Sequence, residues 1–180
     1  MPAAPARTEI ALHVRSIMQL FNSLDPSPFR ERDLDPHTDD FIVGWARELP
    51  RTAPFVIVVE LPAEEAVQPE AKGIGEAFAN YFRHRAEASE RDLRELLRVG
   101  WRSLLIGVVV LAICLLGSQT AAQMIGNAVA ARVVEESLII VGWVANWRPI
   151  EIYLYDWWPI RRRTLLFRRI AAAPVEIREQ

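Results

Sequence analysis

Charged residues are missing from one long stretch of this chain, and this gap constrains the fold more than any other feature of the sequence. No Asp, Glu, Lys or Arg occurs over residues 103–131, and residues 104–116 are almost entirely aliphatic. A transmembrane helix needs about 20 mostly apolar residues to cross a hydrocarbon core of about 30 Å. The stretch is long enough, so the sequence predicts an integral membrane protein.

A second apolar segment follows Glu135 and Glu136. Its uninterrupted part, residues 137–147, is too short to cross a bilayer alone. If the segment continues to about Tyr155, Arg148 and Glu151 lie at bilayer depth; if it stops at residue 147, the rest lies along the membrane surface. With a first span over about 101–122, we expect a transmembrane helical hairpin over residues 101–158.

The N-terminal part of the chain has the pattern of a small α/β domain. Ile10, Leu12 and Val14 alternate with other residues in a period of two that extends toward Met18, which predicts a strand. Asp35 and Pro36 then form a strong helix start, because an Asp caps free N–H groups and a Pro suits the first helical position. The β-branched run 55–61, closed by Pro62, predicts a second, better buried strand, and residues 174–178 predict a possible third.

No proline interrupts residues 70–148, so we expect a long helix that runs directly into the membrane, with a break at Gly100 as the alternative. The fold class is thus an α/β membrane protein: a small cytoplasmic βαβ domain and a stalk helix leading into a two-helix hairpin. The expected parts are a disordered N-terminus (1–7), the α/β domain (8–70), an amphipathic stalk (71–100), the hairpin (101–158) and a basic tail (159–180).

Positive charges set the expected orientation. Arginines precede the first span and follow the second, whereas only Arg132 is positive between them. Because cytoplasmic flanks carry the excess of Lys and Arg, both termini are expected in the cytoplasm, as in a multi-pass protein of the cell inner membrane. The tail also attracts anionic lipid headgroups through Arg161, Arg162, Arg163, Arg168 and Arg169.

The densest group of candidate functional residues lies over residues 147–159. Arg148 and Glu151 are three residues apart and can meet on one helix face, and Asp156 follows. Charges at bilayer depth are costly, and are usually paired or face a cavity. Three interpretations stay open: a structural pair that fixes helix packing and depth, a contact to a partner or lipid, and a role in permeation.

Enzyme chemistry has little support in the sequence. Asp33, Asp35 and His37 are the only candidates for a membrane-tethered enzyme, and a salt-bridged loop with a helix cap explains them. The three histidines have no ligand spacing, a single cysteine builds no zinc site, and a net charge of −2 gives no argument for nucleic-acid binding. We therefore expect no catalytic residues, no metal and no cofactor.

The stretch from Trp147-Arg-Pro to Tyr155-Asp-Trp-Trp-Pro159 resembles one in a family of small, uncharacterised bacterial integral membrane proteins. That family has no assigned activity, so the resemblance implies a membrane location only. The thin α/β domain favours a non-enzymatic interaction or scaffold module, assembled as a homo-oligomer or with another membrane protein. A small channel or transporter component using Arg148 and Glu151 is the alternative.

Overall fold

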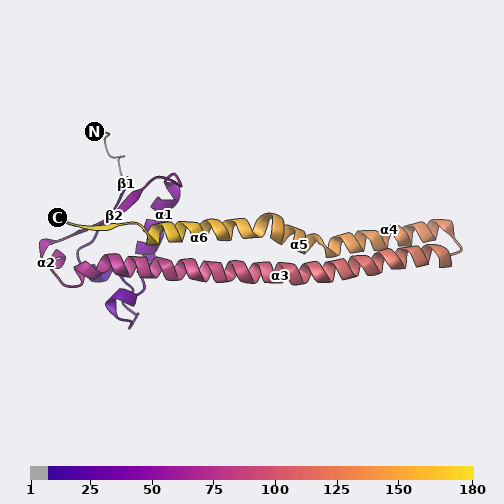
Figure 1. Ribbon diagram of the computed structural model, residues 1–180, viewed down its shortest axis with the longest axis horizontal. Helices are drawn as coiled ribbons and strands as arrows, with labels where there is room; N and C mark the ends of the chain where they lie inside the picture. Colours follow the sequence, from indigo (N-terminus) through magenta and orange to yellow (C-terminus); the bar gives the residue numbers. More distant parts are fainter. Residues whose placement is uncertain (1–7) are drawn as a thin grey trace. The chain divides into compact units, whose positions relative to one another are not determined.

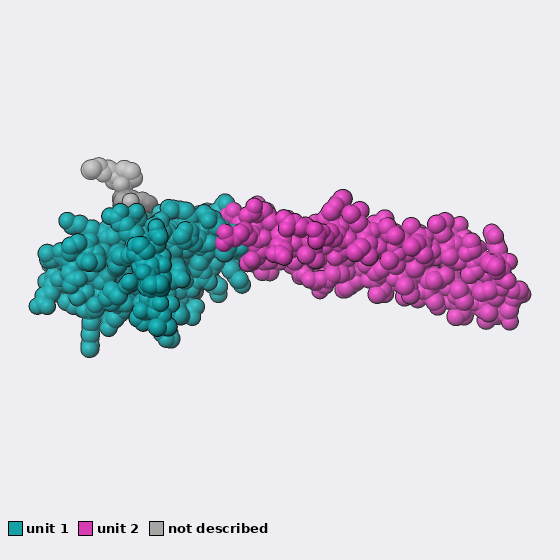
Figure 2. Space-filling view, turned by 90° about the horizontal axis from the view of Figure 1, so that it is seen from below, with its two compact units in different colours: residues 1–89, 162–180 teal, residues 90–161 magenta. Residues whose placement is uncertain are grey.

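The computed structural model describes residues 8–180, so the predicted disorder of residues 1–7 lies outside the described residues. The chain divides into two compact units (Figure 2): residues up to Ser89 together with those from Arg162 onward, and residues 90–161. The first is called here the α/β unit and the second the helical unit. The α/β unit thus includes the first turns of the long helix and the last turns of the final one, in addition to residues 8–70.

Three parallel strands form the sheet of the α/β unit, in the order β1-β2-β3. They are β1 (Thr8–His13), β2 (Phe55–Leu61) and β3 (Val175–Glu179). Ile10 lies opposite Ile57, and Ile57 lies opposite Val175. The predicted strand at 55–61 and the parallel pairing of a βαβ unit are confirmed, and the possible third strand is present.

The first strand is shorter than its alternating pattern predicts, because it ends at His13 and a 3-10 turn, η1 (Ile17–Leu20), follows. Two acceptors stabilise the turn: the Ser16 hydroxyl at 3.4 Å from the Met18 amide, and the Glu65 carboxylate at 2.8 Å from the Ile17 amide. These bonds satisfy amides that a strand would have paired with a neighbour. Ile17 and Leu20 of the turn are buried instead, whereas Met18 is exposed.

Helix α1 (Pro36–Glu48) begins where the sequence predicts, since the Asp35 carboxylate accepts a 2.9 Å hydrogen bond from the His37 amide. Ile42, Val43 and Ala46 of this helix are buried, whereas Phe41 and Trp45 are exposed. Short turns and a one-turn helix connect the larger elements: η2 (Phe29–Glu31), α2 (Ala63–Ala66) and η3 (Ala71–Gly73).

Helices cover one face of the sheet and make a single core with it. Phe78 and Phe82 of α3 (Ile74–Met124) and Phe167 and Ile170 of α6 (Trp157–Ala171) pack there with the odd-numbered residues of β2. On the other face, Glu9 of β1 and Arg178 of β3 make a two-point ion pair at 3.1 Å. Because Glu9 lies opposite Val56 and Arg178 opposite Glu60, the pair crosses β2 at Val58, which is fully buried.

Helix α3 is continuous over 51 residues, which confirms the predicted long helix and removes the break at Gly100. It is the one helix, among the residues described, whose length and composition suit a membrane span. A turn at residues 125–127 leads into α4 (Ala128–Ala145), where the Asn127 side chain caps the Val129 and Ala130 amides. The helix therefore starts before Glu135 and Glu136, which lie in its middle.

The expected two-helix transmembrane hairpin is present only in part. Helix α4 runs back alongside α3 (Figure 1), but it has 18 residues and carries Arg132, Glu135 and Glu136. A full span needs about 20 mostly apolar residues, so α4 alone does not have that composition. The chain then continues through α5 (Trp147–Glu151) and the π-helical turn η4 (Ile152–Asp156) into α6.

Candidate functional site

Arg148 is the centre of a small charged cluster in the helical unit. Its guanidinium lies 2.9 Å from a Glu151 carboxylate oxygen and 3.0 Å from one of Asp156. The side chains of Arg148, Glu151 and Asp156 retain 57%, 42% and 31% of their exposure. The contact between Arg148 and Glu151 that their spacing predicts is present, and Asp156 joins it as a third member.

The local backbone explains how Asp156 reaches Arg148. In a regular α-helix, residues eight apart are separated by about 12 Å along the axis. Here the π-helical turn η4 lies between them, and its wider i→i+5 turns change the path of the chain. The Trp157 indole N–H donates to the Tyr153 carbonyl at 2.8 Å, which satisfies an oxygen within this turn. Turns of this kind often occur at functional positions in helices.

The packing of α4 and α5 on α3 shows at which position along α3 the cluster lies. A Cβ on Gly107 would lie against Ala145 and Asn146, and one on Gly100 against Ile152 and Tyr153. Arg148 lies between these two contacts along the chain. It is therefore level with residues 100–107 of α3, where the last charge before the apolar run, Arg102, also lies. The cluster lies at the charged end of the apolar run and away from its middle.

The line of contact between α3 and α4 is built from small and polar side chains. Gly107 and Gly142 are buried there, together with Cys114, Ser118 and Ala131. A Cβ on Gly107 would meet the Asn146 Oδ1 atom at 2.6 Å and the Ala145 carbonyl oxygen at 3.0 Å, which no real Cβ accepts. The two helices therefore approach closely because these positions have no side chain.

Asn146 provides the polar link between these helices. Its side-chain amide donates to the Gly107 carbonyl at 3.0 Å and to the Gly142 carbonyl at 2.9 Å, and the residue is 8% exposed. Sequence reasoning missed Asn146. The heptad spacing of Gly100, Gly107 and Cys114 is a signal in the sequence that could have indicated one line of contact on α3.

The five tail arginines fall into different surroundings. Arg161 lies over the Trp157 ring at 5.6 Å, and Arg162, Arg163 and Arg168 are exposed. Arg169 donates to the Ala53 carbonyl oxygen, and its guanidinium lies 4.9 Å from the centre of the Phe55 ring. Within the α/β unit, Arg169 thus holds the loop before β2. Contact of this cluster with lipid headgroups stays a prediction.

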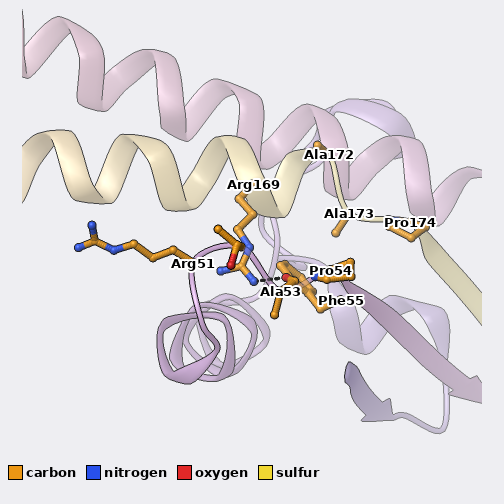
Figure 3. A pocket seen from close by; sticks show the side chains of 9 residues that line it. Arg51, Ala53, Pro54, Phe55, Arg169, Ala172, Ala173 and Pro174 are labelled. Carbon is orange, nitrogen blue, oxygen red and sulfur yellow. Dashed lines mark hydrogen bonds between the residues drawn. The ribbon is translucent and has the colours of Figure 1, made fainter. Parts of the chain in front are cut away.

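A shallow groove opens where β2 and β3 begin, and Figure 3 shows the residues that line it. The Arg169 side chain points to Ala53 and Phe55, while the Arg51 side chain points away from them. The remaining lining is a threonine and small apolar residues: Thr52, Pro54, Ala172, Ala173 and Pro174. Because Arg169 is already engaged by a carbonyl and a ring, the groove presents no converging polar groups that would bind a ligand.

The candidate enzyme residues Asp33, Asp35 and His37 take part in local hydrogen bonds, Asp35 through its side chain and the other two through their backbone amides. Asp35 caps α1, and the Asp33 amide donates to the Asp25 carboxylate at 2.7 Å. That bond, with those from Ser27, lowers the pKa of Asp25. Over residues 8–180 there is no group of three or more His, Cys, Asp or Glu side chains that could hold a metal ion.

Comparison of the chain with protein-family models, with curated proteins and with solved structures found no match. The resemblance around Trp147 and Pro159 therefore stays an expectation.

Proposed function

We propose that this chain is an integral membrane protein that anchors a small α/β unit to a bilayer and serves as a non-enzymatic interaction module. The apolar half of α3 and the adjoining helix α4 form the proposed anchor. In this proposal both helices cross the cell inner membrane, and both termini lie in the cytoplasm.

The observation that carries the proposal is the inverted arrangement of side chains in the helical unit. Large aliphatic side chains point outward: Leu105, Ile106, Val109 and Ile113 are each more than half exposed. Between α3 and α4 the buried positions are small or polar, such as Gly107, Ser118 and Asn146, whereas Ile152, beyond α4, is buried against Gly100. A soluble helix pair places its large apolar residues between the helices, whereas helices in lipid pack through small residues.

Several features at the ends of the apolar layer support the same proposal. Trp101, Trp147 and Tyr155 are exposed, and such amphipathic rings favour the membrane interface. At the far end Arg132 pairs with Glu136 at 3.6 Å, beside the polar residues 118–120. The uncharged layer common to both helices is limited by residues 137–147, and these 11 residues correspond to about 17 Å of helix. Because this is thinner than a typical hydrocarbon core, arginine side chains are expected to extend toward the headgroups.

The position of Arg148 favours an anchoring role over permeation. The permeation alternative uses Arg148 and Glu151 within the bilayer, and would place them near the middle of the apolar layer, facing a cavity. Arg148, Glu151 and Asp156 lie level with the charged end of that layer, and Arg148 pairs with both carboxylates. We propose that this cluster sets the depth of α5 at the headgroup level, beside the basic tail that attracts anionic lipids.

Two arginine substitutions at exposed positions test the membrane anchor. Val109 is 57% exposed and Val99 is 45% exposed, and both lie on α3. At the centre of a span an arginine costs about 2.5–3.5 kcal/mol. Val109→Arg should therefore reduce the fraction of protein that stays in membranes after alkaline extraction, whereas Val99→Arg, next to Arg98, should not.

A water-soluble protein would tolerate both substitutions, because both side chains already face solvent. Equal behaviour of the two variants, with the wild-type protein released by alkali, would overturn the proposal.

A further inference from the structure

The outer edge of β3 is an unpaired strand edge. In the described part of the chain, β3 pairs with β2 on one side and with no strand on the other. Its residues from Glu176 to Glu179 are exposed, including Ile177, which is 37% exposed although it belongs to the core-facing set. Such an edge is a ready template for another strand, unless charges or prolines oppose pairing.

The direction of the backbone groups along this edge follows from the ladder with β2. The Ile57 amide donates to the Pro174 carbonyl at 3.0 Å, and the Gln180 amide donates to the Leu61 carbonyl at 2.9 Å. Because backbone groups alternate along a parallel ladder, the even-numbered residues of β3 face β2. The N–H and C=O groups of Val175, Ile177 and Glu179 therefore point outward.

The sequence of β3, Val-Glu-Ile-Arg-Glu, complements itself when two copies run antiparallel about Ile177. In that register Ile177 pairs with Ile177 of the second copy, and the outward N–H and C=O groups of the two residues hydrogen-bond to each other. Glu176 then lies opposite Arg178, which also pairs with Glu9 of its own sheet, on both sides of the two-fold axis. Opposite charges across strands attract. We propose that the outer edge of β3 is the contact between two copies of this chain, which joins their sheets into one.

Charge selects this register over its neighbours. A shift by one pair toward the start of the strand places Glu176 opposite Glu176, and a shift the other way places Arg178 opposite Arg178. Both alternatives set like charges directly against each other. The register centred on Ile177 also pairs every residue of β3, and it covers the exposed Ile177 side chain with its copy.

This inference deepens the proposed interaction role of the chain and rests on it. The test uses the full-length protein in mild detergent, with Glu176→Arg and Arg178→Glu as separate variants and the oligomer mass measured by native mass spectrometry. Each variant alone sets like charges opposite each other twice, so its dissociation constant should rise roughly tenfold or more. Mixing the two variants restores opposite charges at both positions, so mixed dimers should form at wild-type strength.

A cross-link gives an independent reading of the register. In a Cys114→Ser background, Ile177→Cys should form a disulfide between copies, since directly opposed, hydrogen-bonded residues have Cα atoms about 5.5 Å apart. Glu179→Cys is the matched control, because residue 179 lies opposite residue 175 and not opposite itself.

A wild-type protein that stays in alkali-treated membranes but is monomeric would overturn the β3 contact alone, as would an oligomer whose mass neither charge variant changes. Release of the wild-type protein by alkali would instead overturn the proposed membrane anchor.

Discussion

At the scale of single residues, charged side chains mainly connect neighbouring elements of the fold. Arg85 of α3 pairs with Asp39 of α1 and lies 4.5 Å from the Phe167 ring centre, so one side chain connects three helices of the α/β unit. Arg169 likewise connects α6 to the loop before β2.

The ion pair between Glu9 and Arg178 predicts a pH dependence for the α/β unit. The hydrogen bonds and the charge of Arg178 lower the pKa of Glu9 below its usual value of 4.5. A carboxylate with a lowered folded-state pKa contributes stability above its unfolded pKa and loses it as the pH falls through the folded value. Glu9→Gln should therefore lower the unfolding temperature at neutral pH, and the difference from wild type should disappear in acid.

The measurement is a series of thermal unfolding curves from neutral pH into acid, in one detergent. His13→Gln is a suitable companion variant, because His13 lies on the same face of β1 and contacts Glu60 instead of Arg178. A difference between Glu9→Gln and wild type that stays constant across the series would show that the pair adds no pH-dependent stability.

At the scale of elements, the pairing of α3 with α4 depends on the absence of side chains. Gly107 and Gly142 bring the backbones together, and Asn146 uses that closeness to donate to both of their carbonyls. In an apolar surrounding, neither carbonyl has water as an alternative partner. Close packing and the hydrogen bonds of Asn146 therefore depend on each other.

Gly107→Ala tests this dependence. The new Cβ would overlap Asn146 and the Ala145 backbone, and inserting a methyl group into a packed contact costs about 1–3 kcal/mol. We expect a lower free energy of unfolding for the helical unit, measured by thermal unfolding in detergent. In Gly117→Ala the nearest atom would be 3.6 Å away, so this control should be close to wild type. Equal stability of the two variants would show that the helices separate easily at Gly107.

At the scale of the whole molecule, the distribution of arginines predicts which ends of the chain share one side of a membrane. A reporter that is active only outside the cytoplasm, fused after Gln123, should be active because this residue precedes the turn into α4. The same reporter fused after Gln180 should be silent, since the proposed orientation places the basic flanks in the cytoplasm. The reverse pattern would overturn the orientation, and two silent fusions would indicate that the helices do not cross.

Local rules in the sequence determined several elements by themselves. The Asp35-Pro36 pair fixes the start of α1, the β-branched run fixes β2, and the absence of proline keeps α3 helical through Gly100. The spacing of Arg148 and Glu151 determined their contact. Each of these features depends on residues within a few positions of one another, where backbone sterics and helix geometry decide the outcome.

Only the tertiary structure decided the features that join distant parts of the chain. Asn146 meets Gly107 across 39 residues, Arg178 meets Glu9 across 169, and β1 ends early because Glu65 binds the Ile17 amide. No periodicity encodes these pairs, since each depends on how packed elements align their side chains. The unpaired edge of β3 is also a feature that only the tertiary structure decides. Its residues read as a strand in the sequence, but whether that strand lies in the middle or at the edge is a property of the sheet.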